Sequence, residues 1–383
     1  MRKVLITGGR GFLGRNLRAH LAERTDCAVR IFDLENAPEE LEEGLQEADI
    51  IFHLAGVNRP LDPIEYIAGN SGLTEQICQI LREGGRAPKI VFSSSIQAAR
   101  NNPYGVSKAN AEDALRRYSA ESGAVVRIYR LKNLFGKWCQ PNYNSVTATF
   151  CHNIANGKPI SISDPHAEVE LSYVDDVVSA FLSEINGSQS SNEVGADIPS
   201  YRIQLGDLAD RIYAYHDLHD SLMLPDFEHW FNRALFATYL SYTQQSARDH
   251  QLQIRTDGRG SLAEFIKQKH FGQIFVSRTK PGITRGNHYH HTKTEMFLVV
   301  EGDGLIRMRP IEGGPIEEYR VSGLDYQVVD IPPGYTHAIT NVGEKEMVTL
   351  FWSSEIFDPN RPDTHYLPVD QASDVSPELL GKA

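Results

Sequence analysis

Residues 3–14 read KVLITGGRGFLG, and the fold of the first part of the chain follows from them. A short apolar run ends at Thr7, glycines stand at 8, 11 and 14, and residues 16–25 continue with helical periodicity. Such glycines allow a tight turn, a close approach of a pyrophosphate and close packing of the helix on the strand. The order of strand, glycine turn and helix therefore predicts a dinucleotide-binding turn made by Gly8, Arg10, Gly11, Phe12, Leu13 and Gly14.

Two residues near this turn indicate different cofactors. Asp33 ends the next predicted strand, nineteen residues after Gly14, where a carboxylate usually accepts hydrogen bonds from the ribose hydroxyls of NAD. Arg10 favours NADP, because a guanidinium beside the turn can pair with the 2′-phosphate. We expect NADPH, with NADH as the alternative.

Strands and helices continue to alternate after Asp33. Residues 48–57 predict a buried strand that runs into a loop, residues 71–85 a helix, and residues 89–95 a strand that ends in serines. This alternation predicts right-handed βαβ units and an α/β doubly wound parallel sheet of the Rossmann type. Ligands bind beyond the carboxyl ends of such strands, which adds Leu54, Ala55 and Gly56 to the cofactor site. Residues 33–48 contain no clear third strand.

The candidate catalytic residues lie in PYGVSKANAEDALRRY, residues 103–118. Tyr104 and Lys108 are four residues apart at the start of a predicted helix, so they share one face. An ammonium near the phenol is expected to lower the pKa of Tyr104 and make it usable as an acid or base near neutral pH. A hydroxyl of Ser94 or Ser95 can complete the set by holding a substrate oxygen.

These motifs resemble the extended short-chain dehydrogenase/reductase family, most closely its nucleotide-sugar members, over about residues 1–245. The resemblance rests on TGGRGFLG (7–14), HLAG (53–56), FSSS (92–95), YGVSK (104–108) and RLKNLFG (130–136). It implies that Tyr104 transfers a proton, that Lys108 binds the nicotinamide ribose and tunes Tyr104, and that Ser95 polarises a sugar carbonyl. Candidate contacts for a sugar nucleotide follow at Asn133, Lys137 and Asn142, with packing or surface roles as the alternative.

After about Thr243 the pattern changes to short apolar runs separated by Gly, Pro and Asn turns. Evenly spaced short strands without helices predict an antiparallel sandwich or jelly-roll barrel. We expect a reductase domain over residues 1–245, a second domain over 246–370 and a C-terminal tail over 371–383.

A candidate metal site lies in the second domain. His288 and His290 are two residues apart, which places both imidazoles on one face of a strand, and Glu295 and His337 follow. Three imidazoles and a carboxylate suit a divalent metal with open coordination positions, and we expect Zn²⁺. The spacing resembles the two motifs of the cupin family, although Tyr326 replaces a usual glycine. His291 should point away from the pair.

The order of the two domains resembles a family of bifunctional capsular-polysaccharide enzymes that act in making UDP-N-acetyl-L-fucosamine. HLAGVNRP (53–60), NPYGVSK (102–108), TKPGITRGNHYHHTK (279–293) and DIPPGYTH (330–337) carry the resemblance. It implies C3 epimerisation of a UDP-4-keto-6-deoxy-N-acetylhexosamine by the cupin domain. NADPH-dependent C4 reduction to a UDP-2-acetamido-2,6-dideoxy-L-talose-type product would follow, for capsule or O-antigen synthesis. Lys280, His291 and Tyr335 are candidate epimerase bases by sequence proximity.

A simpler alternative belongs to a different class of function. The chain would then be a single-activity NADP-dependent 4-ketosugar reductase, and its cupin domain would be a structural, dimerisation or substrate-capture module. Proton exchange at C3 of the sugar discriminates between the two.

The composition of the chain limits the kinds of partner that we expect. The net charge of −12 argues against a nucleic-acid surface, and no apolar window is long enough to predict membrane insertion. The four cysteines, at 27, 78, 139 and 151, form no CxxC pair and fit a reducing compartment. We expect a cytoplasmic homodimer whose substrate is a UDP-sugar.

Overall fold

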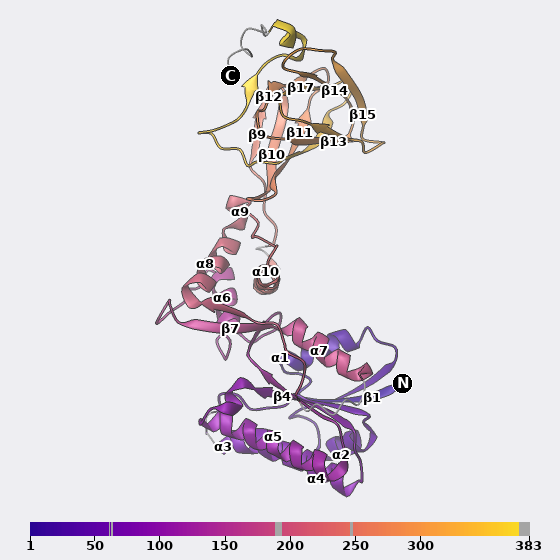
Figure 1. Ribbon diagram of the computed structural model, residues 1–383, viewed down its shortest axis with the longest axis vertical. Helices are drawn as coiled ribbons and strands as arrows, with labels where there is room; N and C mark the ends of the chain where they lie inside the picture. Colours follow the sequence, from indigo (N-terminus) through magenta and orange to yellow (C-terminus); the bar gives the residue numbers. More distant parts are fainter. Residues whose placement is uncertain (61, 63, 188–193, 246–247, 375–383) are drawn as a thin grey trace. The chain divides into compact units, whose positions relative to one another are not determined.

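The structure is a computed structural model that describes residues 1–60, 62, 64–187, 194–245 and 248–374 (Figure 1). The chain forms two compact units, the first comprising Met1–Tyr213 and His229–Gln244, the second Ala214–Glu228 and the chain from Gln245 onward. The chain passes between the units three times, and the expected boundary at 245 adjoins the third passage, whereas the assignment of residues 214–228 to the second unit is not expected from the sequence. Helix η4 (Val369–Asp374) overlaps the expected tail, whose residues 375–383 lie outside the described residues.

The first unit is built on a five-stranded parallel sheet, which confirms the expected doubly wound fold. Its strand order is β2-β1-β3-β4-β5, with bounds Cys27–Phe32, Arg2–Thr7, Ile50–His53, Lys89–Ser95 and Val126–Leu131. The order reverses between β1 and β3, and ligands of such sheets bind at this switch point. Between β2 and β3 the chain forms helix α2 (Pro38–Glu47) and no further strand, so β2 is the edge of the sheet.

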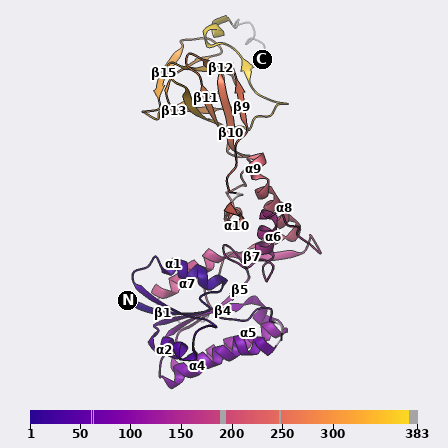
Figure 2. The same ribbon diagram turned by 180° about the vertical axis from the view of Figure 1, so that it is seen from behind.

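Helices cover both faces of this sheet (Figures 1 and 2). Helices α2, α4 (Leu73–Glu83) and α5 (Pro103–Ser122) pack on one face, and α1 (Phe12–Leu21) and α7 (Val174–Asn186) pack on the other. Side chains alternate along each strand, so Leu5 joins the first core while Val4 and Ile6 join the second. Burial on both faces explains the continuous apolar runs of the sequence.

Smaller elements complete the first unit. Strands β6 (Asn133–Phe135), β7 (Glu168–Tyr173) and β8 (Tyr201–Gln204) form a second sheet, with helices α6 (Val146–Ala155) and α10 (Trp230–Tyr242). Helix α8 (Leu205–His216) belongs to this unit up to Tyr213. Short helical turns are α3 (Ile64–Tyr66), η1 (Ile67–Gly72) and η2 (Ile96–Ala99). Among the described residues, no helix has both the length and the hydropathy that a membrane crossing requires.

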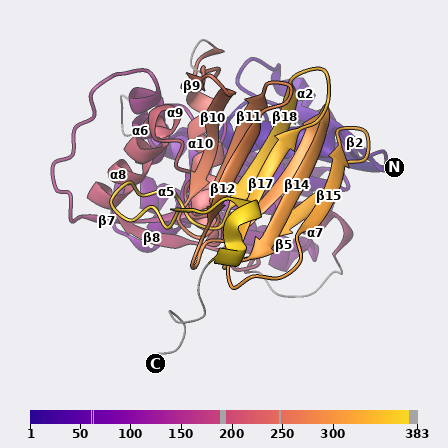
Figure 3. The same cartoon turned by 90° about the horizontal axis from the view of Figure 1, so that it is seen from above.

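The second unit contains two antiparallel sheets, which confirms the expected all-β, cupin-like fold (Figure 3). One sheet has the order β16-β13-β18-β11-β10-β9, with bounds Val328–Ile331, Glu295–Glu301, Met347–Ser353, Gly272–Thr279, Gly260–Gln268 and Ile254–Asp257. The other has the order β15-β14-β17-β12-β19, with bounds Glu317–Ser322, Asp303–Pro310, Tyr335–Asn341, Thr284–Tyr289 and His365–Tyr366. The buried core includes Phe297, Val299, Ile306, Ile339 and Phe351. The short helix α9 (Leu218–Ser221) also belongs to this unit.

Candidate functional site

The glycine turn after β1 brings backbone to backbone at the switch point of the sheet. Gly8 has φ 73°, and a Cβ added there would lie 2.7 Å from the backbone nitrogen of Ala55. A Cβ on Gly14 would lie 2.2 Å from the carbonyl oxygen of Gly8, so α1 packs against the turn too closely for any side chain. Gly11 is the N-cap of α1 and provides no side-chain cap. The N-terminus of α1 is thus open to an anion.

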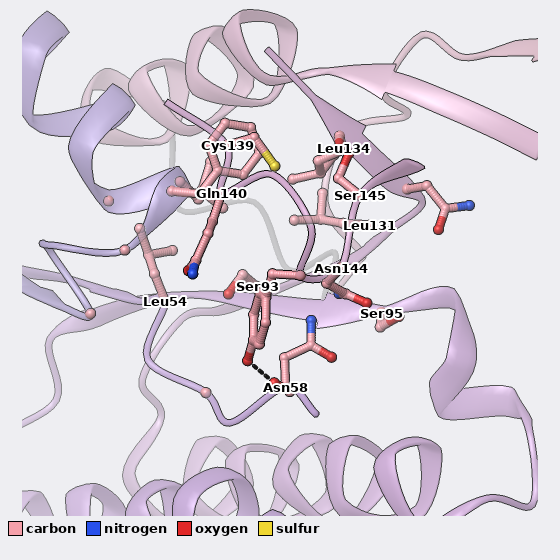
Figure 4. A pocket seen from close by; sticks show the side chains of 18 of the residues that line it. Leu54, Asn58, Ser93, Ser95, Leu131, Leu134, Cys139, Gln140, Asn144 and Ser145 are labelled. Atoms are coloured by element: carbon pink, nitrogen blue, oxygen red, sulfur yellow. Dashed lines mark hydrogen bonds between the residues drawn. The ribbon is translucent and has the colours of Figure 1, made fainter. Parts of the chain in front are cut away.

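A cavity of about 900 Å³ opens at this end of the sheet. The turn after β1, the ends of β3 and β4, the start of α5 and the segment from Leu131 to Ser145 contribute to its lining, part of which is drawn in Figure 4. Of the predicted cofactor residues, Gly8, Arg10, Gly11, Phe12, Leu13, Gly14, Leu54, Gly56 and Lys108 line the cavity, whereas Ala55 and Asp33 do not. Ala55 instead lies behind the turn, against Gly8.

The charged side chains of this cavity all have the same sign. Five cations line it, and no Asp or Glu appears in its lining, which consists of described residues; the cations are Arg10, Arg15, Lys108, Arg100 and Lys132. The chain as a whole carries a net charge of −12. A basic cavity in an acidic protein indicates anionic ligands, such as the phosphates of nucleotides.

Arg10 and Asp33 are coupled through the turn itself. The backbone N–H of Arg10 donates to the carboxylate of Asp33 at 2.7 Å, and the Arg10 guanidinium pairs with Glu35. Arg10 and Asp33 therefore both have partners within the protein.

Tyr104 lies at the first turn of α5, beside the end of β4. Asn102 caps this helix by accepting a hydrogen bond from the N–H of Gly105 at 2.8 Å. Burial raises the pKa of Tyr104, while a hydrogen bond with Ser95 acts in the opposite direction. The expectation that Lys108 lowers the pKa of Tyr104 is wrong for this structure, because burial of the phenol dominates.

Lys108 is buried one helical turn after Tyr104. Its Nζ donates to the carbonyl oxygen of Ser93 at 3.0 Å and lies 4.9 Å from the centre of the Phe92 ring. Burial lowers the pKa of Lys108 to about 8, although Glu112 acts in the opposite direction. A Cβ on Gly56 would lie 3.1 Å from Nζ, so the loop after β3 passes directly over the amine.

The three serines at the end of β4 have different partners. The Ser94 hydroxyl donates to the buried carboxylate of Glu112 at 2.5 Å, and Arg130 pairs with the same carboxylate at 2.6 Å. The Ser93 hydroxyl donates to the carbonyl of His53 at 3.3 Å. Ser95 accepts from the N–H of Gln97 at 3.2 Å and faces Tyr104. The structure therefore brings Ser95, and not Ser94, to the tyrosine.

Only one of the three predicted substrate contacts lies in the cavity. Asn133 lines the cavity, but Lys137 and Asn142 do not. The Lys137 amine instead binds Asp175 at 2.6 Å, and Asn142 lies in a turn with φ 55°. Sequence reasoning missed lining residues that have no local motif, namely Arg100, Gln140, Asn144, His152 and Tyr242.

A second site lies in the second unit, where the four predicted ligands come together. His288, His290, Glu295 and His337 each offer one ligand atom, and these atoms lie within 4.8 Å of one another. A carboxylate oxygen of Glu295 is 3.2 Å from Nε2 of His337 and 3.4 Å from Nε2 of His290. Burial, with His337 acting the same way, lowers the pKa of His288 to about 4, which favours the neutral imidazole that ligates metals.

Backbone carbonyls determine the tautomers of two of these histidines. Nδ1 of His290 lies 2.5 Å from the carbonyl oxygen of Asp363, and Nδ1 of His337 lies 3.2 Å from that of Tyr335. Because a carbonyl can only accept, Nδ1 carries the proton and Nε2 has the lone pair. Both Nε2 atoms are buried without a hydrogen-bond partner among the described residues. Against the effect of burial, the contact with Glu295 raises the pKa of His290, so a proton on His290 can also satisfy the carboxylate. When both imidazoles are neutral, their Nε2 lone pairs and the carboxylate converge on one place, so the residues fit a divalent metal.

Asp363 supports this cluster from outside. Its carboxylate accepts backbone N–H bonds from His291, Thr292 and Lys293 at 2.9, 3.0 and 3.1 Å. Its carbonyl oxygen orients His290. One residue therefore holds both a ligand and the turn that leads to the next ligand, and no sequence motif had indicated it.

The three candidate epimerase bases do not lie in the metal cavity. This cavity of about 340 Å³ has no contribution from Lys280, His291 or Tyr335. His291 is exposed, with its ring 4.7 Å from that of His365. The titratable lining residues other than the ligands are Arg255, Arg259, Glu264, Arg285 and Lys293.

Comparisons with known proteins cover almost the whole chain. Residues 4–193 match the NAD dependent epimerase/dehydratase family, and residues 255–365 match the polysaccharide biosynthesis C-terminal domain. The UDP-2-acetamido-2,6-beta-L-arabino-hexul-4-ose reductase of Pseudomonas aeruginosa is 43% identical over 97% of this chain and 100% of its own length.

Solved structures give the same result. The capsular polysaccharide assembling protein CapF from Staphylococcus aureus is 45% identical, with a TM-score of 0.88 over 96% of this chain and 100% of that chain. A structure of CapF with the inhibitor 3-isopropenyl-tropolone is 42% identical, with a TM-score of 0.84 over 96% and 100%. With such identity along nearly the full length of its relatives, the chain belongs to the CapF family of polysaccharide biosynthesis proteins.

Proposed function

We propose that the first unit reduces the keto group of a UDP-linked 4-ketosugar with a nicotinamide cofactor. The observation that carries this proposal is the assembly of Ser95, Tyr104 and Lys108 beside a glycine turn, in a cavity whose charged residues are all cationic. The cavity can take two phosphate-bearing ligands that meet at Tyr104. The name of the 43% identical relative, a reductase of a UDP-linked hexul-4-ose, supports the same reaction.

The chain's own residues supply orientation and a proton. When bound, the dihydronicotinamide supplies the hydride that reduces C4. The Ser95 hydroxyl would hold the carbonyl oxygen, and Tyr104 would give that oxygen its proton. Because burial raises the pKa of Tyr104, the phenol is protonated at neutral pH and ready to donate. Lys108 would hold the ribose beneath the loop at Gly56.

We favour NADPH over NADH because of Arg10. Its guanidinium pairs with Glu35 at the surface, with both side chains about half exposed or more. Exposed ion pairs contribute little stability, so exchanging Glu35 for a 2′-phosphate costs little. The kcat/KM with NADPH divided by the kcat/KM with NADH measures this preference. The Arg10→Ala substitution should lower the kcat/KM with NADPH and leave the kcat/KM with NADH nearly unchanged.

For the second unit we propose metal-dependent epimerisation at C3 of the same ketosugar, before the reduction. The proton at C3 is acidic because it lies next to the C4 carbonyl, and its removal gives an enolate. A divalent metal held by His288, His290, Glu295 and His337, for which we propose Zn²⁺, would act there as a Lewis acid. The product of both steps would be a UDP-2-acetamido-2,6-dideoxy-L-talose-type sugar for capsule or O-antigen polysaccharide.

One experiment tests both halves. The protein is incubated with a UDP-4-keto-6-deoxy-N-acetylhexosamine in D₂O, with and without NADPH, and the products are followed by NMR. Deuterium should enter C3 without NADPH, and Tyr104→Phe should lose NADPH oxidation but keep this exchange. Loss of exchange in that variant would contradict two independent sites. Absence of exchange in wild-type protein that retains its metal would leave a simple reductase with a non-catalytic second unit.

A further inference from the structure

A β-bulge in the metal cavity changes the direction of one arginine. Strand β12 pairs with β17 so that Arg285 is opposite Ile339 and His288 is opposite His337, and the register shifts between Gly286 and His288. Directly opposed residues of two strands share a face. Ile339 and His337 both point into the unit, where Ile339 lines the metal cavity and His337 is a metal-ligand candidate. Arg285 and His288 therefore face the same cavity although they are three residues apart, which regular alternation forbids.

The backbone at the bulge is built for this geometry. Gly286 has φ 98°, and a Cβ there would lie 2.7 Å from the carbonyl oxygen of His337. Asn287 has φ 58°, a left-handed conformation that asparagine tolerates better than most residues. The carbonyl of Asn287 accepts the N–H of Leu367 at 2.9 Å, which holds the bulge in place. Residues 286 and 287 thus direct the Arg285 side chain inward.

The charge of Arg285 is poorly compensated inside the protein. Its side chain is 13% exposed, and its nearest carboxylate oxygen, on Asp257, is 3.9 Å away. That carboxylate already binds Arg259, through the guanidinium at 2.6 Å and the backbone N–H at 2.8 Å. Nε of Arg285 donates to the Thr279 hydroxyl at 3.1 Å, and Nη2 donates to the carbonyl oxygen of Arg278 at 3.5 Å, so its hydrogen bonds go to neutral groups. Burial, followed by repulsion from Arg259, lowers the pKa of Arg285.

We propose that Arg285, together with Arg259 and Arg255 in the same cavity lining, binds the diphosphate of the nucleotide sugar in the second unit. A guanidinium presents paired N–H donors that match phosphate oxygens, and an anion offsets the cost of burying its charge. The sugar would then extend from the arginines toward the histidines. This inference rests on the proposed epimerase function and names the group by which that site holds its substrate.

The test uses full-length protein loaded with Mn²⁺ and UDP as the probe. Paramagnetic relaxation of the ³¹P signals of UDP reports only nucleotide close to the metal, and Zn²⁺-loaded protein provides the diamagnetic baseline for UDP bound in the first unit. The enhancement should be present in wild type. In Arg285→Ala, apparent affinity for UDP at this site should fall about tenfold or more, as for lost hydrogen bonds between charged groups.

A matched control is Arg278→Ala, because Arg278 lies on the preceding strand, is 56% exposed and does not line the cavity. Its enhancement should equal that of wild type. Metal content is measured in each variant, and Arg285→Lys provides a variant that keeps the charge and should weaken binding less. Wild-type enhancement in metal-loaded Arg285→Ala would overturn the subsite. If wild type shows the enhancement but no exchange at C3, the epimerase proposal fails and the diphosphate subsite stands.

Discussion

At the scale of single residues, the serines at the end of β4 show how neighbours along a strand acquire different tasks. Ser94 donates to the buried carboxylate of Glu112, which also pairs with Arg130, whereas Ser95 faces Tyr104. Glu112 is fully buried, and buried carboxylates depend on every hydrogen bond they accept. We therefore expect Ser94 to contribute to the stability of the fold and Ser95 to contribute to the proposed reduction.

This difference predicts opposite phenotypes for two matched substitutions. Ser95→Ala should lower kcat for ketosugar reduction about 100-fold, as when one donor to a reacting oxygen is removed, with little change in thermal stability. Ser94→Ala should lose about 1–3 kcal/mol of stability because the Glu112 carboxylate loses a donor, while kcat stays within a few-fold. Steady-state kinetics and thermal unfolding of both variants check this. A larger kcat defect in Ser94→Ala would reverse the assignment.

The residues of the reductase site could be predicted from the sequence only where the motif is local. The helical spacing places Tyr104 and Lys108 on one face, but the pKa of Tyr104 depends on burial by distant segments and was predicted in the wrong direction. Lys137 was predicted beside the substrate, yet it pairs with Asp175, which is 38 residues away in sequence. Local patterns give residue type and spacing, whereas partners across the fold decide which side chains stay available.

At the scale of elements, strand alternation predicts that His288 and His290 share a face, and it could not predict that Arg285 joins them. The bulge at Asn287 inserts one residue, and only the Gly-Asn pair in the sequence hints at it. In the first unit, the sequence shows no strand between residues 33 and 48, and the chain forms helix α2 there. The regular alternation of a strand can be predicted from the sequence, but a β-bulge that interrupts it depends on how the strand pairs with its neighbours.

His53 links two parallel strands to a helix and predicts a pH dependence. Its ring bonds Thr7 on β1 at 2.7 Å and Thr74 on α4 at 2.9 Å, and burial lowers the pKa of His53 to about 3. Between pH 3 and its ordinary value of 6.5, the unfolded chain takes up a proton there and the native unit does not, so stability falls as pH falls. We expect a loss on the order of 2 kcal/mol from pH 7 to pH 5.

Hydrogen exchange of amides in β1 and β3 measures this loss in the first unit alone. His53→Gln keeps a hydrogen-bonding side chain without the titration, so its exchange should change less over the same pH range. Equal pH dependence in both proteins would assign the effect to other groups.

At the scale of the whole molecule, each site is lined entirely by residues of one unit. The change near residue 243 from alternating helices and strands to short strands predicts two domains. It does not predict that residues 214–228 belong to the second unit. Two backbone hydrogen bonds tie residues 214–228 to the second unit. The N–H of Leu224 donates to the carbonyl of Lys267 at 2.8 Å, and the N–H of Lys267 donates to the carbonyl of Leu222 at 2.8 Å. Such bonds carry no side-chain signature. The separation of the two sites has a functional consequence that intact chains can test.

If the proposed reactions occur at separate sites, two inactive variants should complement each other. Tyr104→Phe should epimerise without reducing, and His290→Ala should lose its metal and reduce only sugar that is already epimerised. Neither variant alone forms the final product, but a mixture with NADPH should form it, at a rate that rises with the concentration of each variant. NMR of the product measures the outcome, and each variant doubled in concentration is the control. A mixture that stays inactive, although each variant keeps its own half-reaction, would mean that the intermediate passes only within one molecule.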